Sequence, residues 1–275
     1  MRHFRAKFLL TAVAVSFGLA GSVNAADMPF PVKTPLMPSC VWCGWYVGAN
    51  GGYGWGDATG RVGNFSTAPN DIAFGPPLAV GAVPSFFGVK AAGGFGGGQF
   101  GYNRVAGNWL LGFEADIQGA DIGHTNTIVF LGAPEFDSTL STGHDHVDRF
   151  GTARGRVGTT VGNVLFYGTG GLAYGGVNNS VAVRDTAPGG TTNFTGSSAG
   201  TRFGWAAGAG VEWMFTPKWS VKAEYLHVDL GSSNTTMLDP VNVPGGFATY
   251  RFHHEFDSVR AGVNYHFGGP VVAKY

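Results

Sequence analysis

Charged residues are scarce in this sequence. Asp, Glu, Lys and Arg make up 12% of the 275 residues and cancel to a formal net charge of zero. Typical soluble domains contain about 25% charged residues, so a water-exposed surface is poorly supplied here. The balance of charge gives no indication of a nucleic-acid partner, and the apolar fraction of 44% argues against a disordered chain. The abundant residues are instead glycine and the aromatics, which suit strands with one small-residue face and one face against lipid.

Cysteine is also scarce, with two residues, Cys40 and Cys43, in the motif Cys-Val-Trp-Cys. A redox-active Cys-x-x-Cys usually opens a helix within a thioredoxin-like βαβ unit, and no such pattern surrounds this one. In an oxidising compartment, two nearby cysteines can instead form a small-loop disulfide. We therefore expect Cys40 and Cys43 to be either a local disulfide or two inactive thiols.

Long apolar runs are missing after the N-terminal segment, so no membrane-spanning helix is predicted there. The N-terminal segment has a basic start, an apolar run at 8–20 and then Val23-Asn24-Ala25. This order predicts a cleavable secretory signal over residues 1–25, with cleavage after Ala25 or Ala26. An exported chain without a membrane helix can still enter a membrane as a closed β-barrel.

Eight later segments have strand character, and each is longer than the about 9–11 residues that a tilted strand needs to cross a bilayer. A Pro-rich stretch at 26–43 precedes them and is expected to be a periplasmic arm, and a short tail at 268–275 follows them. The strand-like segments lie roughly at 44–56, 88–102, 108–119, 147–161, 164–177, 201–215, 218–230 and 255–267.

Apolar residues alternate with polar or small ones along these segments, which is the period of a strand with two different faces. Trp109, Leu111 and Phe113 share one parity, for example, whereas Glu114 and Asp116 share the other. A soluble sandwich buries its apolar face, whereas an outer-membrane barrel turns that face toward lipid. Alternation alone therefore leaves both folds open.

Connection lengths and aromatic positions favour the barrel. Short connections alternate with long ones, as in outer-membrane barrels with short periplasmic turns and long external loops. The short ones are 103–107, 162–163 and 216–217, and the long ones are near 57–87, 120–146, 178–200 and 231–254. Aromatic residues at the strand ends near the short turns would form an interfacial girdle; they are Trp45, Tyr102, Trp109, Phe215, Trp219 and Phe267. We predict an all-β, eight-stranded antiparallel up-and-down transmembrane β-barrel over 44–267, with a secreted β-sandwich as the alternative.

The predicted inner face carries as many acidic as basic residues. They are Glu114, Asp116, Arg154, Arg156, Glu212, Lys222, Glu224 and Arg260. Side chains just fill the interior of an eight-stranded barrel, and an isolated buried charge costs several kcal/mol, so these residues should pair with one another. We expect a structural salt-bridge core, and the alternative is a narrow ion path lined by the same charges.

Histidines are concentrated in two of the predicted long loops. His124, His144 and His146 fall in the second loop, and His253 and His254 fall in the fourth. Neutral imidazoles are common ligands of metals and of haem iron, and both loops would lie above the same barrel mouth. His144, His146, His253 and His254 are therefore candidate haem or metal ligands, with solvated loop residues as the alternative interpretation.

The segment 44–53, Gly-Trp-Tyr-Val-Gly-Ala-Asn-Gly-Gly-Tyr, resembles the first-strand motif of a family of small alphaproteobacterial outer-membrane β-barrel proteins. These are the RopB-type surface proteins and their haemin-binding relatives. Segments 97–103, 151–158, 219–225 and 259–267 fit the same family. The resemblance implies an OmpA-like barrel, inserted by the outer-membrane assembly machinery through a terminal strand that ends in an aromatic residue. Here Phe267 is followed by the tail, a departure from barrels that end on that aromatic.

Together these features predict an outer-membrane surface protein with a structural role in the envelope, in a family described as porin-like or as surface antigens. Narrow ion passage through the lumen is one open function, and haem or metal binding by the loops is the alternative. No cofactor is expected. The expected partners are outer-membrane lipid, lipopolysaccharide and the barrel assembly machinery, and a monomer is favoured over a trimer.

An enzyme is not expected. The segment Gly196-Ser197-Ser198-Ala199-Gly200 matches the pattern of a hydrolase nucleophile but lacks the strand-to-helix elbow that exposes such a serine. A membrane hydrolase would need serine, histidine and acidic side chains that converge at the outer rim of the barrel.

Overall fold

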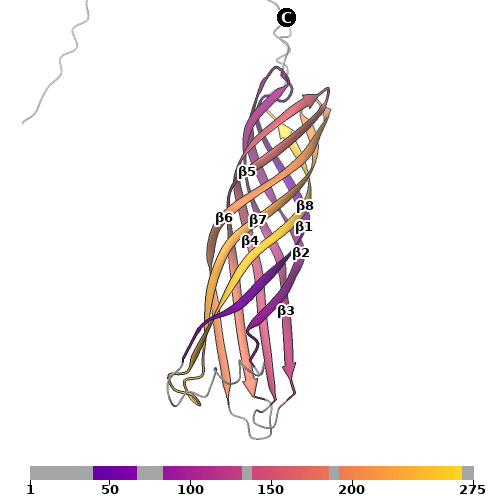
Figure 1. Ribbon diagram of the computed structural model, residues 1–275. Coiled ribbons are helices and arrows are strands. Elements are labelled where there is room, and N and C mark those ends of the chain that lie inside the picture. Colours follow the sequence, from indigo (N-terminus) through magenta and orange to yellow (C-terminus); the bar gives the residue numbers. More distant parts are fainter. Residues whose placement is uncertain (1–39, 67–82, 132–137, 186–191, 268–275) are drawn as a thin grey trace, which may run out of the picture. The chain divides into compact units, whose positions relative to one another are not determined.

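The computed structural model describes residues 40–66, 83–131, 138–185 and 192–267, which form a closed barrel of eight antiparallel strands (Figure 1). Each strand pairs with its neighbours in sequence, and β1 closes the ring by pairing with β8. The strands are β1 (Gly44–Phe65), β2 (Phe86–Ala106), β3 (Trp109–Phe130), β4 (Thr139–Val161), β5 (Val164–Asp185), β6 (Asn193–Thr216), β7 (Trp219–Leu238) and β8 (Phe247–His266). The predicted eight-stranded fold is confirmed. The predicted signal peptide, most of the predicted arm and the predicted tail lie outside the described residues.

No helix in the described part of the chain is long and apolar enough to cross a membrane. Three two-residue turns join strands at one end of the barrel, at the top of Figure 1. Gly107 and Gly162 open two of these turns with φ of +62° and +60°, which glycine adopts without steric cost. In outer-membrane barrels the short turns face the periplasm, so this is the periplasmic end.

The half of the barrel next to these turns has an apolar outer face. The six predicted girdle residues are all at least 36% exposed, and two of them, Trp45 and Tyr102, are in ring contact with centroids 5.2 Å apart. All eight strands contribute exposed apolar side chains to this belt, among them Val47, Phe100, Leu111, Val157, Phe166, Trp205, Val221 and Val263. Such a surface fits lipid rather than water.

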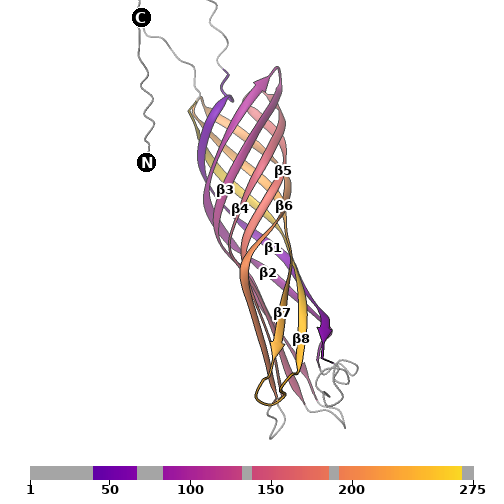
Figure 2. The ribbon, with the colours of Figure 1, turned by 90° about the vertical axis from the view of Figure 1, so that its left-hand side faces the viewer.

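The strands extend well beyond the predicted bounds on the side away from the periplasmic end (Figure 2). β1 continues to Phe65, and β8 begins already at Phe247. The expected extent of the long external loops was therefore wrong, because strand takes up most of the second, third and fourth predicted loops and both ends of the first. The connections between the strands are 66–85, 131–138, 186–192 and 239–246. We refer to the added strand lengths as the extension.

In the extension the apolar side chains point inward and the polar ones outward, the reverse of the arrangement in the belt. A pattern of lipid-facing strands therefore does not predict these segments. Tyr250 and Phe252 of β8 are fully buried inside, whereas Arg251 between them is exposed. On β7, Met237 is buried and Thr236 is exposed. A strand that leaves the bilayer needs a polar outer face and an apolar inner one, as in a soluble protein.

The backbone pairing divides much of the extension into two four-stranded sheets. The pairing between β2 and β3 stops at Ala92 and Gly123. Between β6 and β7 it is interrupted from Trp205 to Thr195 on β6. One sheet is therefore β3–β6 and the other is β7, β8, β1 and β2. An apolar cluster packs between them, the extension core; its members include Ile128, Val181, Val183 and Phe194 from the first sheet and Val62, Met237, Tyr250 and Phe252 from the second.

Apolar and polar layers alternate along the lumen. The periplasmic apolar cluster contains Trp42, Leu110, Leu165, Tyr167 and Met214. Next comes the interior charge cluster, made of the eight predicted inward charges. Beyond it is the aromatic layer, where Phe150 contacts Phe95 and Phe256 edge to face with centroids 5.1 and 5.2 Å apart. A second polar layer around His254 separates the aromatic layer from the extension core.

Candidate functional site in the barrel interior

The interior charge cluster is built from opposite charges on neighbouring strands. The directly paired positions are Glu114 with Arg154, Glu212 with Lys222, and Glu224 with Arg260. Opposite charges at facing positions stabilise a pair of strands. The structure thus places all eight residues in one layer of the lumen, where side chains from strands β3, β4, β6, β7 and β8 meet.

Glu114 lies at the centre of the cluster and contacts all four basic residues. Its Oε1 accepts hydrogen bonds from Arg154 Nη2 at 2.7 Å, Lys222 Nζ at 2.8 Å and Arg260 Nη2 at 3.1 Å. Its Oε2 accepts a longer one from Arg156 Nη1 at 3.4 Å. These four partners come from three other strands, so this carboxylate ties opposite walls of the barrel together.

Each remaining acid has its own donors. Glu224 accepts from Arg260 Nε at 2.8 Å and from Arg154 Nη1 at 2.5 Å. Asp116 accepts from the Thr152 hydroxyl at 2.7 Å and from the Thr152 backbone N–H at 3.1 Å. Every acid in the cluster is therefore satisfied by more than one donor.

Uncharged side chains complete the cluster, and the sequence analysis did not single them out. The Tyr46 hydroxyl donates to Glu114 Oε2 at 2.8 Å and accepts from Arg156 Nη1 at 2.5 Å. Glu212 accepts from Ser220 Oγ at 2.5 Å and from Asn264 Nδ2 at 2.7 Å. Charge does not identify these uncharged residues in the sequence. Their position in the strand does, because each lies an even number of residues from an inward charge or glycine and therefore points to the same face.

The eight charged side chains are screened from solvent. Their side chains are 0–1% exposed in the ion pairs that they form. Burial of unpaired ions is costly, so a neutral and fully hydrogen-bonded set is what a filled lumen requires. The arrangement holds strands together and excludes water; it presents no exposed nucleophile or acid.

Gly101 of β2 makes room for this packing. A Cβ at this position would lie 2.4 Å from the Tyr46 hydroxyl and 2.5 Å from the Phe113 carbonyl oxygen. We expect Gly101→Ala to lower the free energy of unfolding by about 1–3 kcal/mol, because overpacking displaces Tyr46 from Glu114. Urea unfolding in detergent micelles, followed by tryptophan fluorescence, measures the loss.

Gly98→Ala is the matched control on the same strand, because its Cβ would meet Gly48 O at an ordinary 3.7 Å. Near-equal stabilities of the two variants would contradict the proposed steric role of Gly101.

The structure does not bring the four candidate histidines together. They lie on strands rather than in loops, as the extension absorbs both segments. His144 and His146 of β4 stack on each other with centroids 6.1 Å apart. His253 lies on β8 near Asp229 and Glu255, and β8 is separated from β4 by three strands in either direction. No group of three or more His, Cys, Asp or Glu residues within the described ranges could hold a metal ion.

His254, by contrast, points into the lumen and is 2% exposed. Its Nδ1 lies 3.1 Å from Asp145 Oδ1, an ion-pair distance, although neither atom is aligned for a hydrogen bond. Its Nε2 lies 2.9 Å from Ser233 Oγ and 3.3 Å from Asn179 Nδ2. Asp145 and Asn179 belong to one sheet of the extension, and His254 and Ser233 to the other. His254 therefore links the two sheets.

Asp145, His254 and Ser233 are arranged in the order of a hydrolase triad, acid, histidine and serine. All three residues are at most 3% exposed, and they lie between the aromatic layer and the extension core rather than at the outer rim. A nucleophile needs space for a substrate carbonyl. The burial of Ser233 leaves this arrangement structural.

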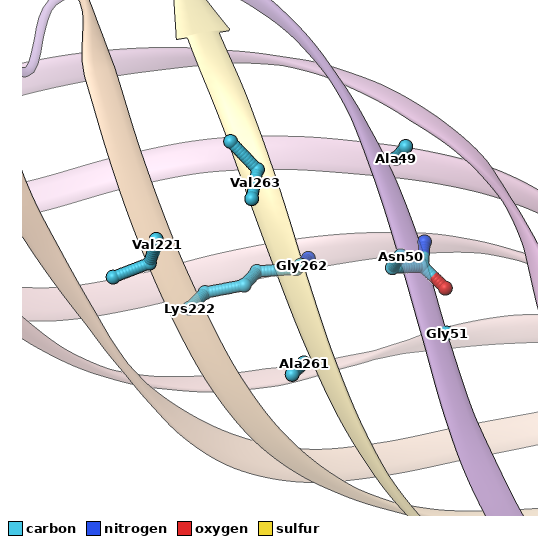
Figure 3. A pocket seen from close by; sticks show the side chains of 8 residues that line it. All are labelled: Ala49, Asn50, Gly51, Val221, Lys222, Ala261, Gly262 and Val263. Atoms are coloured by element: carbon cyan, nitrogen blue, oxygen red, sulfur yellow. The ribbon is translucent and has the colours of Figure 1, made fainter.

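A hollow of about 360 Å³ lies in the wall formed by β7, β8 and β1 (Figure 3). Its exposed lining is apolar and small, with Ala49, Gly51 and Ala261 between the larger Val221 and Val263. Lys222, whose side chain extends behind β8 in Figure 3, is buried and bonded to Glu114. The hollow thus lies in the lipid-facing belt and offers no exposed polar group for catalysis.

Cys40 and Cys43 form a disulfide immediately before β1. A backbone hydrogen bond of 3.2 Å from Cys43 N–H to the Cys40 carbonyl closes the same turn. The pair belongs to a small ring at the periplasmic end of the barrel.

Solved structures of small barrels align with this chain at low sequence identity. The outer membrane protein OprG from Pseudomonas aeruginosa is 12% identical, with a TM-score of 0.43 over 82% of this chain and 97% of that one. The outer membrane protease OmpT from Escherichia coli is 13% identical, with a TM-score of 0.42 over the same shares.

Sequence relatives are closer. The 31 kDa outer-membrane immunogenic protein of Brucella melitensis biotype 1 is 34% identical over 267 residues, which are 94% of this chain and 98% of the relative. The 22 kDa outer membrane protein of Rhizobium leguminosarum bv. viciae is 28% identical over 203 residues, 74% of this chain and 71% of the relative. The model of the outer membrane protein beta-barrel domain matches residues 19–267. Because this model covers most of the chain and the outer face of the barrel is apolar, the chain belongs to the outer membrane protein β-barrel family and is an outer-membrane surface protein.

Proposed function

We propose that this protein is a surface barrel with a closed lumen, which anchors the extension and its connecting loops outside the outer membrane. Its role in the envelope is structural, and other molecules meet the extension rather than the interior. One observation carries this proposal: apolar and polar layers fill the lumen along its described length. The belt of exposed apolar residues on all eight strands further favours a lipid-embedded monomer in contact with lipopolysaccharide.

Ion passage along the lumen would need a continuous file of water. In the interior charge cluster, acids and bases are already in direct contact, and the rings of Phe95, Phe150 and Phe256 lie edge to face next to it. An eight-stranded barrel leaves room for side chains and little else. A closed lumen is therefore better supported than a porin-like channel, and no observation favours haem or metal binding by the histidines.

Planar bilayer recording of the refolded mature protein tests the proposal. We expect no discrete conductance steps, because the paired charges hold the lumen closed and no ion can replace a side chain without breaking several hydrogen bonds. A wide porin recorded in the same bilayer establishes the sensitivity, and protease protection of the reconstituted protein establishes insertion.

The variants Lys222→Met and Glu224→Gln test whether the interior charges line an ion path. Discrete, ion-selective steps whose size changes in either variant would mean that the charges line a path, and the closed lumen would then be rejected in favour of a narrow pore.

A further inference from the structure

Trp42 differs from every other tryptophan of the chain. All seven tryptophans lie in the described residues, and six of them are 41–64% exposed on the outer belt. Trp42 is 3% exposed and lies inside the periplasmic apolar cluster, with Leu110, Leu165, Tyr167 and Met214. These partners come from β3, β5 and β6. A residue that precedes the first strand therefore fills the mouth of the barrel.

Trp42 is connected to the interior charge cluster through His266. Its ring meets the His266 ring edge to face, with centroids 5.9 Å apart. The Nε2 of His266 is 3.0 Å from Ser220 Oγ and 3.5 Å from Glu212 Oε1. The indole thus lies in the apolar layer next to His266, on the periplasmic side of the buried charges.

Two local features position the indole. The disulfide between Cys40 and Cys43 closes a ring that contains Trp42, and Cys43 is bonded directly to the first residue of β1. That residue, Gly44, has φ of +104°, in a region that residues with a side chain rarely adopt. The ring is therefore short, covalently closed and set at a fixed angle to β1.

The indole is not fully satisfied in this position. Its Nε1 is buried and has no hydrogen-bond acceptor among the described residues. A buried donor without a partner opposes burial, because the donor loses its hydrogen bonds to water. Apolar packing favours the buried position of Trp42, and the unpaired indole N–H opposes it. The covalent ring restricts the freedom of the segment outside the barrel, so it can determine whether the buried position is the stable one.

We propose that residues 40–43 form a redox-dependent stopper, which the disulfide holds in the periplasmic mouth of the barrel. Reduction by a dithiol transfers two electrons and two protons: the S–S bond breaks, Cys40 and Cys43 become thiols, and the dithiol becomes a disulfide. The freed segment then withdraws Trp42, and water reaches His266. This inference rests on the proposed closed lumen, to which it adds a movable periplasmic end.

Fluorine NMR of the refolded protein with fluorotryptophan in micelles tests the stopper, and Trp42→Phe assigns the Trp42 signal. A water-soluble paramagnetic chelate should leave that signal intact in the oxidised protein. After dithiothreitol treatment, and in the double variant Cys40→Ser/Cys43→Ser, the chelate should abolish it, while the six outer tryptophans respond as before. A Trp42 signal that stays protected in both the reduced protein and the double variant overturns the proposal.

Bilayer recording of the same double variant separates this proposal from the closed lumen. With Trp42 accessible and the bilayer silent, the stopper and the closed lumen both stand. With Trp42 accessible and discrete conductance steps present, the stopper stands, but the interior charge cluster does not close the lumen by itself.

Discussion

Glu114→Gln is expected to lower the free energy of unfolding by about 3–5 kcal/mol, because it leaves a buried excess of positive charge. Glu114 contacts all four bases of the interior charge cluster, so no neighbouring base keeps its full set of partners. The glutamine retains the size of the side chain, which restricts the effect to charge and hydrogen bonding. Urea titration of the refolded protein in micelles, followed by the gel mobility of the folded band, measures the loss.

Asp148→Asn is the matched control. Asp148 pairs with Arg149 at 3.1 Å, but their side chains are 38% and 58% exposed, and exposed pairs contribute about 0–1 kcal/mol. The double variant Glu114→Gln/Arg154→Gln restores neutrality and should lose less than the sum of its two single variants. Equal losses in Glu114→Gln and Asp148→Asn would show that the cluster is no more important than a surface pair.

His254→Leu is expected to open the extension while the lipid-embedded part of the barrel stays folded. The substitution leaves the buried Asp145 side chain without the imidazole beside it, and a buried polar group that loses its partner costs about 1–3 kcal/mol. His254 contacts residues of both sheets, so the loss should appear where the pairing between β6 and β7 is interrupted. Hydrogen exchange and limited proteolysis of the reconstituted protein locate the change.

Two further variants isolate the cause. His253→Leu alters the adjacent residue, whose side chain is 39% exposed, and should leave protection unchanged. His254→Leu/Asp145→Leu removes both polar groups and should recover much of the lost stability, because replacing both partners of a buried polar pair by apolar groups is often nearly neutral. If the double variant is as unstable as His254→Leu alone, the loss of the partner of Asp145 is not the cause.

The sequence was sufficient for the part of the barrel that crosses the membrane. Period-two alternation is a local property, and lipid demands an apolar outer face on every strand, so residues such as Leu111 and Glu114 could be assigned to opposite faces. It was insufficient beyond the lipid, where Tyr250 and Phe252 turn inward because water lies outside. The same alternation there has the opposite meaning, so the pattern of lipid-facing strands predicts loops for these segments.

The sequence by itself determined that the chain forms eight strands, turns an apolar belt outward and carries a neutral set of charges inward. Only the tertiary structure decided which of these groups meet. Strand tilt and stagger set the height of each side chain in the lumen, and alternation does not encode that height. Glu114 therefore reaches Lys222, 108 residues away, and His254 reaches Asp145. Trp42, which precedes the first strand, enters the lumen because the ring and Gly44 direct it there.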